Sequence, residues 1–309
     1  MAKKGIVVGS FVVDLMGRCP HLPAPGETVK GDTFKTGPGG KGSNQAVAAK
    51  RAGADVNAVT KIGKDQFGQI ARDCFEEEDF PLEYLIEDEN HDTGIALILV
   101  DKNTSQNEIL VYSGACDYFT DEDFKKIRPL LDASDILLMQ LEINLDFTER
   151  CLKYAKSKGI CTILNPAPVV QISDELYDYI DIITPNEVEA SILSGITVTD
   201  EESAHKSAEW FRKKGVETVI ITMGSKGAYL ETKEHRQLFP IFSVNAIDTT
   251  GAGDAFNGGL LAALTEEKDL LEAICFAQAT AALSVTKIGT APSMPYREEI
   301  DTFLADKNR

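Results

Sequence analysis

The stretch Ile136-Leu137-Leu138-Met139 is a run of four apolar residues, and Val219-Ile220-Ile221 repeats that pattern further along the chain. A strand whose two faces are both buried has no polar side, so it forms a continuous apolar run instead of an alternating one. Strands of this kind are typical of parallel sheets that carry helices on both faces. The two runs therefore predict the centre of a mainly parallel sheet in an α/β protein.

Helical and strand-like patterns alternate on both sides of these runs. Strands are expected at 135–139, 160–164, 181–184 and 217–222, and helices at 121–131, 145–157, 200–214 and 268–285. The first part of the chain adds strands at 6–8 and 57–62, and helices at 43–52 and 65–80. This regular alternation predicts a Rossmann-like, mainly parallel sheet flanked by helices.

Two segments in the first part of the chain depart from the alternation. Residues 18–40 hold four prolines and several glycines, so they predict extended or looping chain. The β-rich runs 93–100 and 109–112 flank the polar turn 101–105, which favours a hairpin; the alternative is two more buried strands of the main sheet. We therefore expect one α/β domain over residues 1–309, with a small inserted β-sheet lid formed from about 11–37 and 92–116.

The composition narrows the classes of partner. The formal net charge is -18 at pH 7, so nucleic acids and acidic membrane surfaces would be repelled. An anionic cofactor such as ATP remains compatible, because local backbone N–H groups can hold a phosphate on an acidic protein.

The cysteines and the start of the chain bear on the location. The six cysteines form no C-x-x-C pair and no cluster with histidine, which argues against zinc and for reduced thiols. The apolar run at 6–8 is too short for a signal peptide, and no stretch approaches the roughly 20 apolar residues of a membrane helix. A cytoplasmic protein is expected.

The stretch Asp248-Thr249-Thr250-Gly251-Ala252-Gly253-Asp254 comes just before a helical pattern. Small residues at a helix N-terminus leave unpaired N–H groups that attract an anion, so Gly251, Ala252 and Gly253 predict a phosphate site. A carboxylate at Asp254 would repel that phosphate, and its expected task is to accept a proton from an attacking hydroxyl group. The alternative is a glycine-rich turn with Asp254 as an ordinary acid of the first helical turn.

A second glycine-rich stretch, Gly37-Pro38-Gly39-Gly40-Lys41-Gly42-Ser43-Asn44-Gln45, also opens a helix. It is not a P-loop, because Gly42 follows Lys41 where Ser or Thr should stand. Its lysine and asparagine offer the mixed donors and acceptors that polyol hydroxyls require. The alternative is a flexible loop with a helix cap.

Three of the predicted strands end in polar residues. Gln140-Leu141-Glu142 follows one strand, at the carboxyl edge where open α/β sheets bind ligands. Asn186 and Glu189 follow another and, three residues apart, would share a helix face beside a hydrated Mg²⁺. The turn Thr222-Met223-Gly224-Ser225-Lys226-Gly227 follows a third and suits a nucleotide. Each alone is better explained as a cap or turn, and it is their occurrence at three strand ends that favours a site.

Taken together, these residues resemble the PfkB-type carbohydrate kinases, in particular their ribokinase branch, over nearly the whole chain. Two signatures carry the resemblance, Gly39-Gly40-Lys41-Gly42-Ser43-Asn44-Gln45-Ala46 and Asp248-Thr249-Thr250-Gly251-Ala252-Gly253-Asp254-Ala255-Phe256, about 200 residues apart. The resemblance implies a Rossmann-like domain with a small β lid, and transfer of the ATP γ-phosphoryl group to a sugar hydroxyl, O5 of ribose.

The resemblance also implies roles for individual residues. Asp254 matches the family's catalytic base, and Gly251, Ala252 and Gly253 match its anion hole. The positions that match sugar contacts are Asp14, Gly40, Lys41, Gly42, Asn44, Glu142 and Asp254. The positions that match nucleotide contacts are Asn186, Thr222, Gly224, Ser225, Lys226, Gly227, Gly253 and Gln278.

Metal ions and a second subunit are implied in the same way. The positions that match a monovalent cation site, usually occupied by potassium, are Asp248, Thr250, Ser284, Lys287, Gly289 and Ser293. Asn186 and Glu189 match the element near Mg²⁺. Because the lid of these kinases often pairs two subunits, the resemblance also implies a homodimer.

Two positions depart from the family pattern and leave other functions open. Val12 stands where many members place a polar sugar contact, and Gln278 where histidine or asparagine often flanks adenine. A kinase of deoxyribose, another sugar or a nucleoside is the alternative enzyme. A dinucleotide-dependent oxidoreductase would need G-x-G-x-x-G after the first strand, which the chain lacks. A binding-only protein would have no need of Asp254.

Overall fold

The computed structural model describes residues 2–104 and 106–307, and within them the predicted fold class is confirmed. The large sheet has the strand order β13-β12-β11-β10-β9-β8-β1-β4-β5. Its strands are β1 (Gly5–Val8), β4 (Val56–Gly63), β5 (Leu85–Asp88), β8 (Ile136–Met139), β9 (Cys161–Leu164), β10 (Ile182–Ile183), β11 (Thr218–Thr222), β12 (Ala228–Glu231) and β13 (Arg236–Phe239). The pairs from β11 to β5 are parallel, whereas β12 and β13 add an antiparallel edge.

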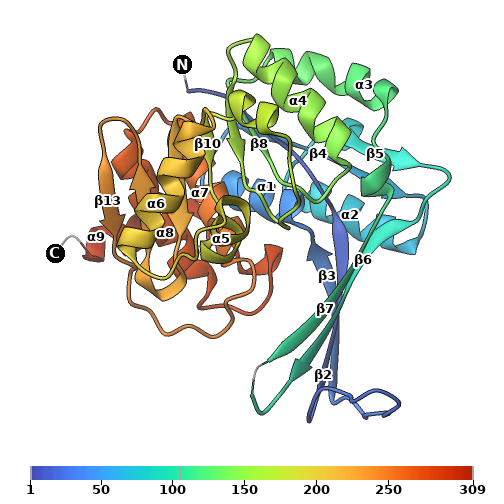
Figure 1. Ribbon diagram of the computed structural model, residues 1–309. Helices are drawn as coiled ribbons and strands as arrows, with labels where there is room; N and C mark the ends of the chain where they lie inside the picture. Colours follow the sequence, from blue (N-terminus) through green and yellow to red (C-terminus); the bar gives the residue numbers. More distant parts are fainter. Residues whose placement is uncertain (1, 105, 308–309) are drawn as a thin grey trace.

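Helices cover both faces of this sheet (Figure 1). They are α1 (Lys41–Arg51), α2 (Gln66–Glu77), α3 (Asp121–Asp132), α4 (Leu145–Ser157), α5 (Glu187–Ser194), α6 (Glu201–Lys213), α7 (Ala252–Thr265), α8 (Leu270–Ser284) and α9 (Arg297–Lys307). Short 3₁₀ turns lie at η1 (Leu82–Tyr84), η2 (Ala115–Tyr118), η3 (Asp174–Tyr179), η4 (Gly224–Lys226) and η5 (Ala291–Ser293).

The continuous apolar runs divide their side chains between two cores. Leu138 of β8 and Ile220 of β11 belong to one buried cluster, together with residues of α1, α7 and α8. Leu137 and Ile221, their immediate neighbours, belong to a second cluster with residues of α3, α4 and α6. Because side chains alternate along a strand, each run supplies both cores, and that is why it shows no polar face.

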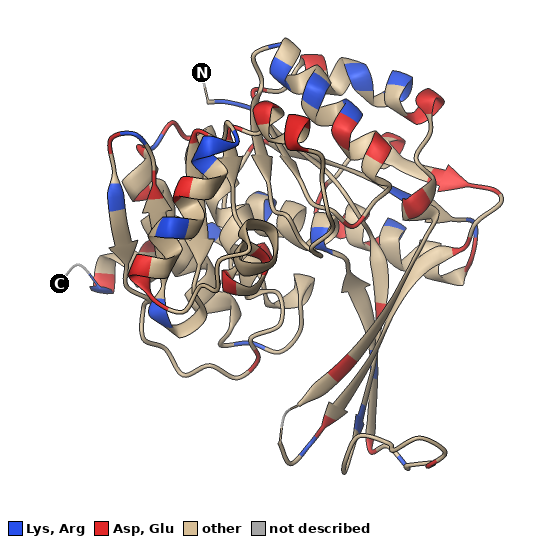
Figure 2. Cartoon of the chain, viewed as in Figure 1, with Lys and Arg blue, Asp and Glu red and all other residues tan. Residues whose placement is uncertain are grey.

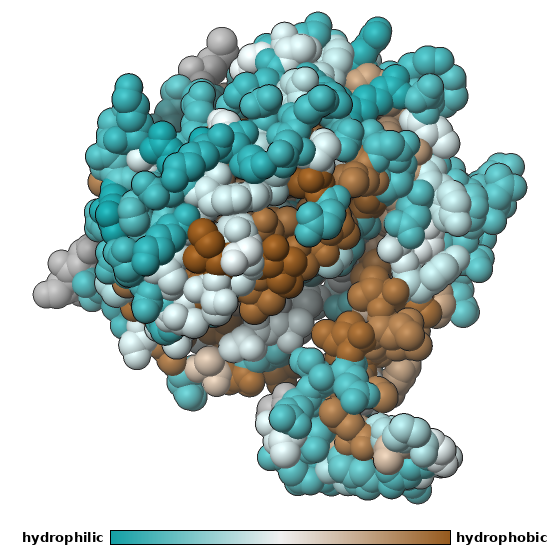
Figure 3. Space-filling view, in the orientation of Figure 1, coloured by the Kyte–Doolittle hydropathy of each residue, from teal (hydrophilic) through white to brown (hydrophobic). Residues whose placement is uncertain are grey.

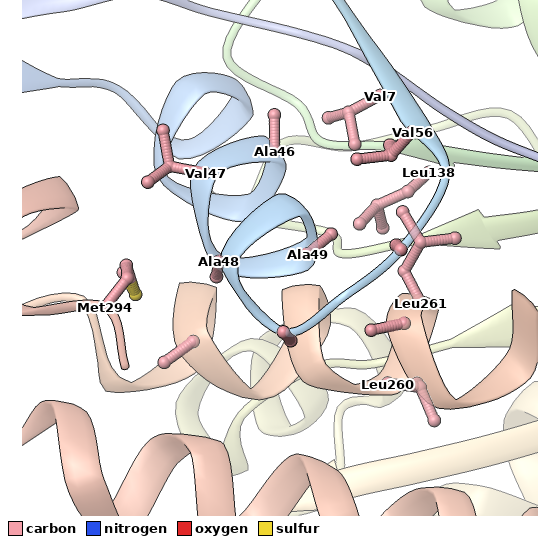
Figure 4. Packing of buried hydrophobic residues seen from close by; sticks show 14 of the residues in the cluster. Val7, Ala46, Val47, Ala48, Ala49, Val56, Leu138, Leu260, Leu261 and Met294 are labelled. Atoms are coloured by element: carbon pink, nitrogen blue, oxygen red, sulfur yellow. The ribbon is translucent and has the colours of Figure 1, made fainter. Parts of the chain in front are cut away.

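Helices α1 and α7 meet under the large sheet (Figure 4). Residues Ala46–Ala49 of α1 belong to one cluster with sheet residues such as Val7 and Leu138 and with the α7 residues Leu260 and Leu261. Gly258 of α7 lets the helices approach this closely, since a Cβ there would lie 2.7 Å from the carbonyl oxygen of Gln45. The close crossing fixes the N-termini of the two helices relative to each other.

A separate four-stranded sheet, called the small sheet below, projects from the body (Figure 1). Its order is β3-β2-β6-β7, from β2 (Val12–Cys19), β3 (Thr33–Gly39), β6 (Thr93–Asp101) and β7 (Asn107–Gly114). β2 pairs antiparallel with β3 and parallel with β6, and β6 pairs antiparallel with β7.

The small sheet confirms one prediction and corrects another. The hairpin over 93–100 and 109–112 is present as β6 and β7, although Ser105 of the predicted turn lies outside the described residues. Residues 18–40 are only partly loop, because β2 runs to Cys19 and residues 33–39 form β3. The prolines in this segment sit mostly between those strands, while Pro38 lies in β3, an edge strand where proline is tolerated.

Charge and polarity are distributed unevenly over the chain. Figure 2 shows blue and red segments spread densely over the outer helices and sparsely along the strands of the small sheet.

Among the described residues, no helix combines the length and the apolar character that crossing a membrane requires.

Candidate active site

The carboxyl ends of the parallel strands bring the predicted polar residues to one edge of the large sheet. Ser10 follows β1, Glu142 follows β8, Asn165 follows β9, and Asn186 follows β10. The N-termini of α1 and α7 face the same edge, because Asn44 and Gln45 of α1 both bond to Asp254 of α7. Residues from both glycine-rich stretches therefore share one site.

Asp254 lies in the first turn of α7 and accepts two side-chain hydrogen bonds. The Asn44 amide donates to Oδ2 at 3.0 Å, and the Gln45 amide donates to Oδ1 at 2.9 Å. α7 begins after Gly251, whose φ of 77° is in the left-handed region that favours glycine. The carboxylate is thus held at a buried helix N-terminus by two neutral donors.

A chain of buried amides supports this arrangement. Gln45 also donates to Asn165 at 3.1 Å and accepts from Gln140 at 2.7 Å. Asn165 donates to the Thr184 carbonyl oxygen at 2.9 Å, and the Thr184 hydroxyl donates to Asn257 of α7 at 2.6 Å. Each amide has its donor and acceptor ends assigned by these bonds, so the chain fixes α7 against the ends of β8, β9 and β10.

Lys41 and Glu142 form the second part of the site. The Glu142 carboxylate accepts from the Lys41 backbone N–H at 2.8 Å and from the Ser10 hydroxyl at 2.5 Å. Burial by itself lowers the pKa of the Lys41 ammonium, but the carboxylates of Asp254, Glu142 and Glu189 raise it overall. Burial raises the pKa of Glu142 despite the nearby lysine. Lys41 is therefore a cation set among carboxylates.

Asp14 of β2 reaches this site from the small sheet. Its Oδ2 accepts from the Thr290 hydroxyl at 3.0 Å, and the carboxylate lies against the α-carbon of Gly39. Burial is the main cause that raises the pKa of Asp14; the bond from Thr290 opposes it and the charges of Glu142 and Asp254 add to it, so the pKa is about 6. The small sheet thus contributes an acidic group to the edge where Asp254 lies.

Two loops meet beside the start of α7. The Asp248 carboxylate accepts the N–H of Thr250 at 3.0 Å with one oxygen and that of Gly289 at 3.0 Å with the other. The backbone N–H groups of Ile247 and Asp248 also donate to the carbonyl oxygen of Val285, at the end of α8. Of the predicted cation residues, Asp248, Thr250 and Gly289 are consequently joined by hydrogen bonds, while Ser284, Lys287 and Ser293 belong to the same segment as Gly289.

The predicted Mg²⁺ residues differ in detail from expectation. Asn186 does not share a helix face with Glu189; it is the N-cap of α5, and the two side chains form a reciprocal capping box. The Asn186 Oδ1 accepts two backbone N–H groups, and Glu189 accepts the N–H of Asn186. Burial raises the pKa of Glu189. The spacing of three residues reflects capping rather than adjacent helical side chains.

The predicted nucleotide residues follow β10 and β11. Thr222 forms an isolated bridge with Asn186, and its N–H bonds to the Pro185 carbonyl oxygen at 2.9 Å. Gln278 of α8 donates to the carbonyl oxygen of Phe239 at 3.0 Å, and that same carbonyl lies against Gly227. The turn after β11 and Gln278 are thereby linked through the end of β13.

Two predicted side chains are directed away from the site. The Lys226 ammonium bonds to the carbonyl oxygen of Thr199, and the Lys287 ammonium pairs with Glu299 at 2.7 Å. Only the backbone of these residues is left to contact a ligand in this arrangement. Ser10, Thr290 and Asn257 are site residues that carry no sequence signal of their own, because their partners lie 73 to 276 positions away.

A family model described as pfkB family carbohydrate kinase matches residues 2–297. The chain is 45% identical over 304 residues to the ribokinase of Haemophilus influenzae, covering 98% of this chain and 99% of that protein. It is also 36% identical over 300 residues to a deoxyribokinase of Salmonella typhi, covering 97% and 98%.

Solved structures show the same likeness. A ribokinase from Thermotoga maritima has a TM-score of 0.88 and 38% identity, covering 99% of this chain and all of that one. An Arabidopsis thaliana ribokinase complexed with ribose and ATP has a TM-score of 0.89 and 31% identity, covering 98% and 99%. The likeness extends over essentially the entire length of both chains.

Proposed function

The chain belongs to the pfkB family of carbohydrate kinases, and from that premise we propose that it transfers the γ-phosphoryl group of ATP to O5 of D-ribose. The products are ribose 5-phosphate and ADP. Relatives named ribokinase match along the full length of the chain, and one of the matching structures holds ribose and ATP. The chain is accordingly an ATP-dependent sugar kinase.

The observation that carries the catalytic assignment is the setting of Asp254. The carboxylate stands at the N-terminus of α7 and is oriented by the Asn44 and Gln45 amides. In the proposed step, O5 attacks the γ-phosphorus, its proton passes to Asp254, and the bond between that phosphorus and the β–γ bridging oxygen breaks. The electron pair of that bond leaves with ADP.

The backbone of Gly251, Ala252 and Gly253 supplies the proposed anion hole. Their N–H groups lie at the N-cap and first turn of α7, where no intrahelical carbonyl accepts them, although the Ala252 N–H donates to the Thr249 carbonyl oxygen at 3.3 Å. The helix dipole adds positive potential there. A Cβ at Gly253 would meet no other group within 4 Å, so a phosphoryl group has room to approach. Charge that develops on the γ-phosphoryl oxygens would be stabilised there.

The proposed sugar-binding part of the site consists of Asp14, Glu142 and the residues at the start of α1. Gly40 and Gly42 permit close approach of the backbone, with φ at 89° for Gly40. The Asn44 Oδ1 is buried and has no hydrogen-bond partner among the described residues, which is the property of an acceptor that a sugar hydroxyl satisfies. Asp14, Asn44 and Glu142 are the proposed hydroxyl partners, with the Lys41 backbone beside them.

Mg²⁺ and K⁺ are proposed cofactors beside these groups. Mg²⁺ would neutralise charge on the ATP phosphates, and it binds few protein ligands and retains waters, so Glu189 and Asn186 suit a water-mediated contact. For a monovalent cation, the facing loops provide carbonyl oxygens and Asp248, with contributions from Thr250, Ser284, Lys287, Gly289 and Ser293. Asp248 binds both loops through their N–H groups, which supports that placement.

The nucleotide base and ribose are proposed to lie beyond the phosphates, over the ends of β10 and β11. The turn Gly224–Gly227 and Gln278 meet at Phe239, which supports a nucleotide site made of backbone groups and a buried amide. Asn186 and Thr222, paired across β10 and β11, continue the same edge toward Asp254.

The small sheet is proposed to act as a lid and as the contact between two subunits. It delivers Asp14 to the sugar, so its movement toward the body would exclude water, which competes as a phosphoryl acceptor. Its strands also leave large apolar side chains exposed, and Figure 3 shows hydrophobic colour on this part of the molecule. We place the enzyme in the cytoplasm, where ATP is available and its six free cysteines stay reduced.

Deoxyribose is a second candidate substrate because of Val12. Val12 and Asp14 are two residues apart in β2, so their side chains share the face that meets the sugar. An apolar neighbour is compatible with a sugar that lacks one hydroxyl group. The relative named deoxyribokinase is consistent with such a substrate.

The test is an ATP-consumption panel over ribose, deoxyribose, fructose and nucleosides, with and without potassium. We expect the highest kcat/KM with ribose and formation of ribose 5-phosphate. Asp254→Asn should keep ATP and sugar binding, measured by calorimetry, but lose about a hundredfold to ten-thousandfold in kcat. Asp269→Asn is the matched control, since Asp269 caps α8 and asparagine caps equally well.

Two results would contradict the proposal. Absence of ATP consumption with every acceptor would exclude a sugar kinase. Near-normal turnover of Asp254→Asn would leave the kinase function in place but remove Asp254 as the base.

A further inference from the structure

Thr290 lies at the junction of the parts that the proposed function assigns to separate tasks. It is buried, with 8% of its surface exposed, and it precedes the short turn η5. Its hydroxyl lies 3.0 Å from Oδ2 of Asp14 and 3.2 Å from the carbonyl oxygen of Pro38 in β3. Residues at opposite ends of the chain, 276 positions apart, therefore meet through one hydroxyl group.

The backbone and methyl group of Thr290 lie beside the residues proposed to hold the transferred phosphoryl group. A Cβ at Gly251, the N-cap of α7, would lie 3.5 Å from the Thr290 Cα and 3.6 Å from its Cγ2. The preceding residue, Gly289, donates its N–H to Asp248 at 3.0 Å. Thr290 thus packs against the start of the proposed anion hole while its hydroxyl faces Asp14.

The turn that carries Thr290 is fixed by hydrogen bonds from Arg51 and Ser293. The Arg51 guanidinium donates to the carbonyl oxygens of Ala291 at 3.2 Å and Met294 at 3.1 Å, and it pairs with Glu78. The Ser293 hydroxyl donates to the Thr290 carbonyl oxygen at 2.8 Å. A donor fixed on such a turn can define the position of a partner on a mobile element.

We propose that Thr290 is a positioning residue for the sugar substrate. Its hydroxyl orients the Asp14 carboxylate toward the sugar, and through this bond it fixes the position of the small sheet relative to the anion hole. With Oδ2 occupied by Thr290, Oδ1 is the oxygen left for a sugar hydroxyl. This inference rests on the proposed function and extends it to a residue outside both glycine-rich stretches.

The charges around Asp14 explain why a donor is needed there. Glu142 and Asp254 both act on Asp14 through their negative charge, and no other side chain of the described residues is seen to donate to its carboxylate. A neutral hydroxyl stabilises the carboxylate without adding a positive charge that would compete for the phosphates. Without that bond, the carboxylate would be free to turn away from its two acidic neighbours.

The experiment is steady-state kinetics of Thr290→Val, Thr290→Ser and Thr290→Ala with ribose and ATP. Loss of a hydrogen bond to a carboxylate should raise the ribose KM by about tenfold or more in the Val and Ala variants. Their kcat should change by less than about threefold and their ATP KM should remain unchanged, because the reacting groups are untouched. Thr290→Ser, which restores the donor, should return the ribose KM to near the parent value.

A double-mutant comparison with Asp14→Asn provides a second test of the role of Thr290. If Thr290 acts through the carboxylate, Thr290→Val should add little to the ribose KM of Asp14→Asn, so the two changes should be non-additive. Thermal unfolding of every variant separates positioning from loss of fold, and Thr290→Ala keeps the test available if valine packs poorly.

Different outcomes would refute the role of Thr290 and the proposed kinase function. A parent-like ribose KM in folded Thr290→Val and Thr290→Ala, or full additivity with Asp14→Asn, would refute the role of Thr290 while leaving the kinase function intact. Absence of turnover by the parent enzyme with every sugar would refute the proposed function, and this inference with it.

Discussion

Asp14 brings a carboxylate into a setting that already holds Glu142 and Asp254. Its pKa is raised from 3.8 to about 6 in the folded chain, with burial as the main cause. Between these two values the folded state binds more protons than the unfolded state does, so ionisation of Asp14 lowers stability as the pH rises. The group that is proposed to bind sugar therefore destabilises the unliganded fold at neutral pH.

Asp14→Asn should relieve this effect. At about pH 8 the variant is expected to be more stable than the parent by up to about 3 kcal/mol, the equivalent of roughly two pKa units, and the difference should largely disappear below about pH 4. Urea unfolding at both pH values measures it. Asp79→Asn is the control, because Asp79 is exposed and has a positive φ that asparagine tolerates.

A stability difference that is the same at both pH values would show that the effect does not arise from ionisation. The same variant should bind ribose more weakly, because the amide lacks the negative charge that strengthens hydrogen bonds from sugar hydroxyls.

Individual residues also mark how far a sequence can predict this site. The glycines and the helix that follow Asp248 already indicate an anion site, and Asp254 stands out as a carboxylate within it. The amides that orient Asp254 could not be identified in the same way, since Asn44 and Gln45 lie about 210 positions away. Their relation depends on the crossing of α1 and α7, which no local pattern encodes.

At the scale of elements, the base of the small sheet is joined to the body through Lys61 of β4. The Lys61 ammonium lies 3.0 Å from Asp88 of β5 and 2.9 Å from Asp123 of α3, and it donates to the Tyr118 carbonyl oxygen at 2.7 Å. Burial by itself raises the pKa of Asp88, but the Asn90 N–H, Lys61 and His91 together lower it to about 2. Tyr118 ends the turn η2, which follows β7, and its ring stacks on His91, which precedes β6.

Lys61→Met should remove the cation and leave two nearly buried carboxylates without their ammonium partner. The expected loss is about 3–5 kcal/mol of unfolding free energy, measured by urea denaturation at neutral pH. Lys64→Met is the control, because that side chain is half exposed and pairs only with surface carboxylates, so its loss should be below about 1 kcal/mol. Equal losses in the two variants would contradict a structural role for the cluster.

The strands differ in how well they can be predicted from the sequence. β8 and β11 are buried on both faces and are predicted from their apolar runs, whereas the extended or looping chain predicted over 18–40 covers β3 and only the end of β2. β3 is an exposed edge strand with glycine and proline, so its sequence lacks both the apolar run and the alternation that indicate a strand. Its existence depends on pairing with β2, which is a tertiary contact.

On the scale of the whole molecule, the small sheet leaves large apolar side chains exposed on one face, beyond the base where Leu15 and Ile95 pack against the core. Leu97, Leu99 and Leu110 share this face with Phe34, which is 68% exposed, and a hollow of about 450 Å³ lined by Gly17, Phe34 and Leu99 lies on it. Asp14 points to the opposite face because it alternates with Leu15. An apolar face of this kind supports the proposed two-fold contact between copies of the chain.

Leu110→Asp should therefore convert a dimer into a monomer, since it places a charge in the centre of the apolar face. Sedimentation equilibrium measures the mass, and Leu82→Asp is the control because that exposed leucine lies in η1, outside the small sheet. A parent chain that sediments as a monomer would contradict the dimer, and an unchanged dimer in Leu110→Asp would place the contact elsewhere.

The two cores of the large sheet have different consequences for folding during synthesis. The cluster beneath α3, α4 and α6 draws its buried residues from Ile6 to Tyr229, so it can close before the end of the chain is made. The cluster around α1 also needs α7, α8 and Ile300 of α9. During synthesis, we expect the apolar face of α1 to stay uncovered until the last quarter of the chain has been made. The proposed sugar-binding half then acquires its core only when the segment with Asp254, the proposed base, has emerged.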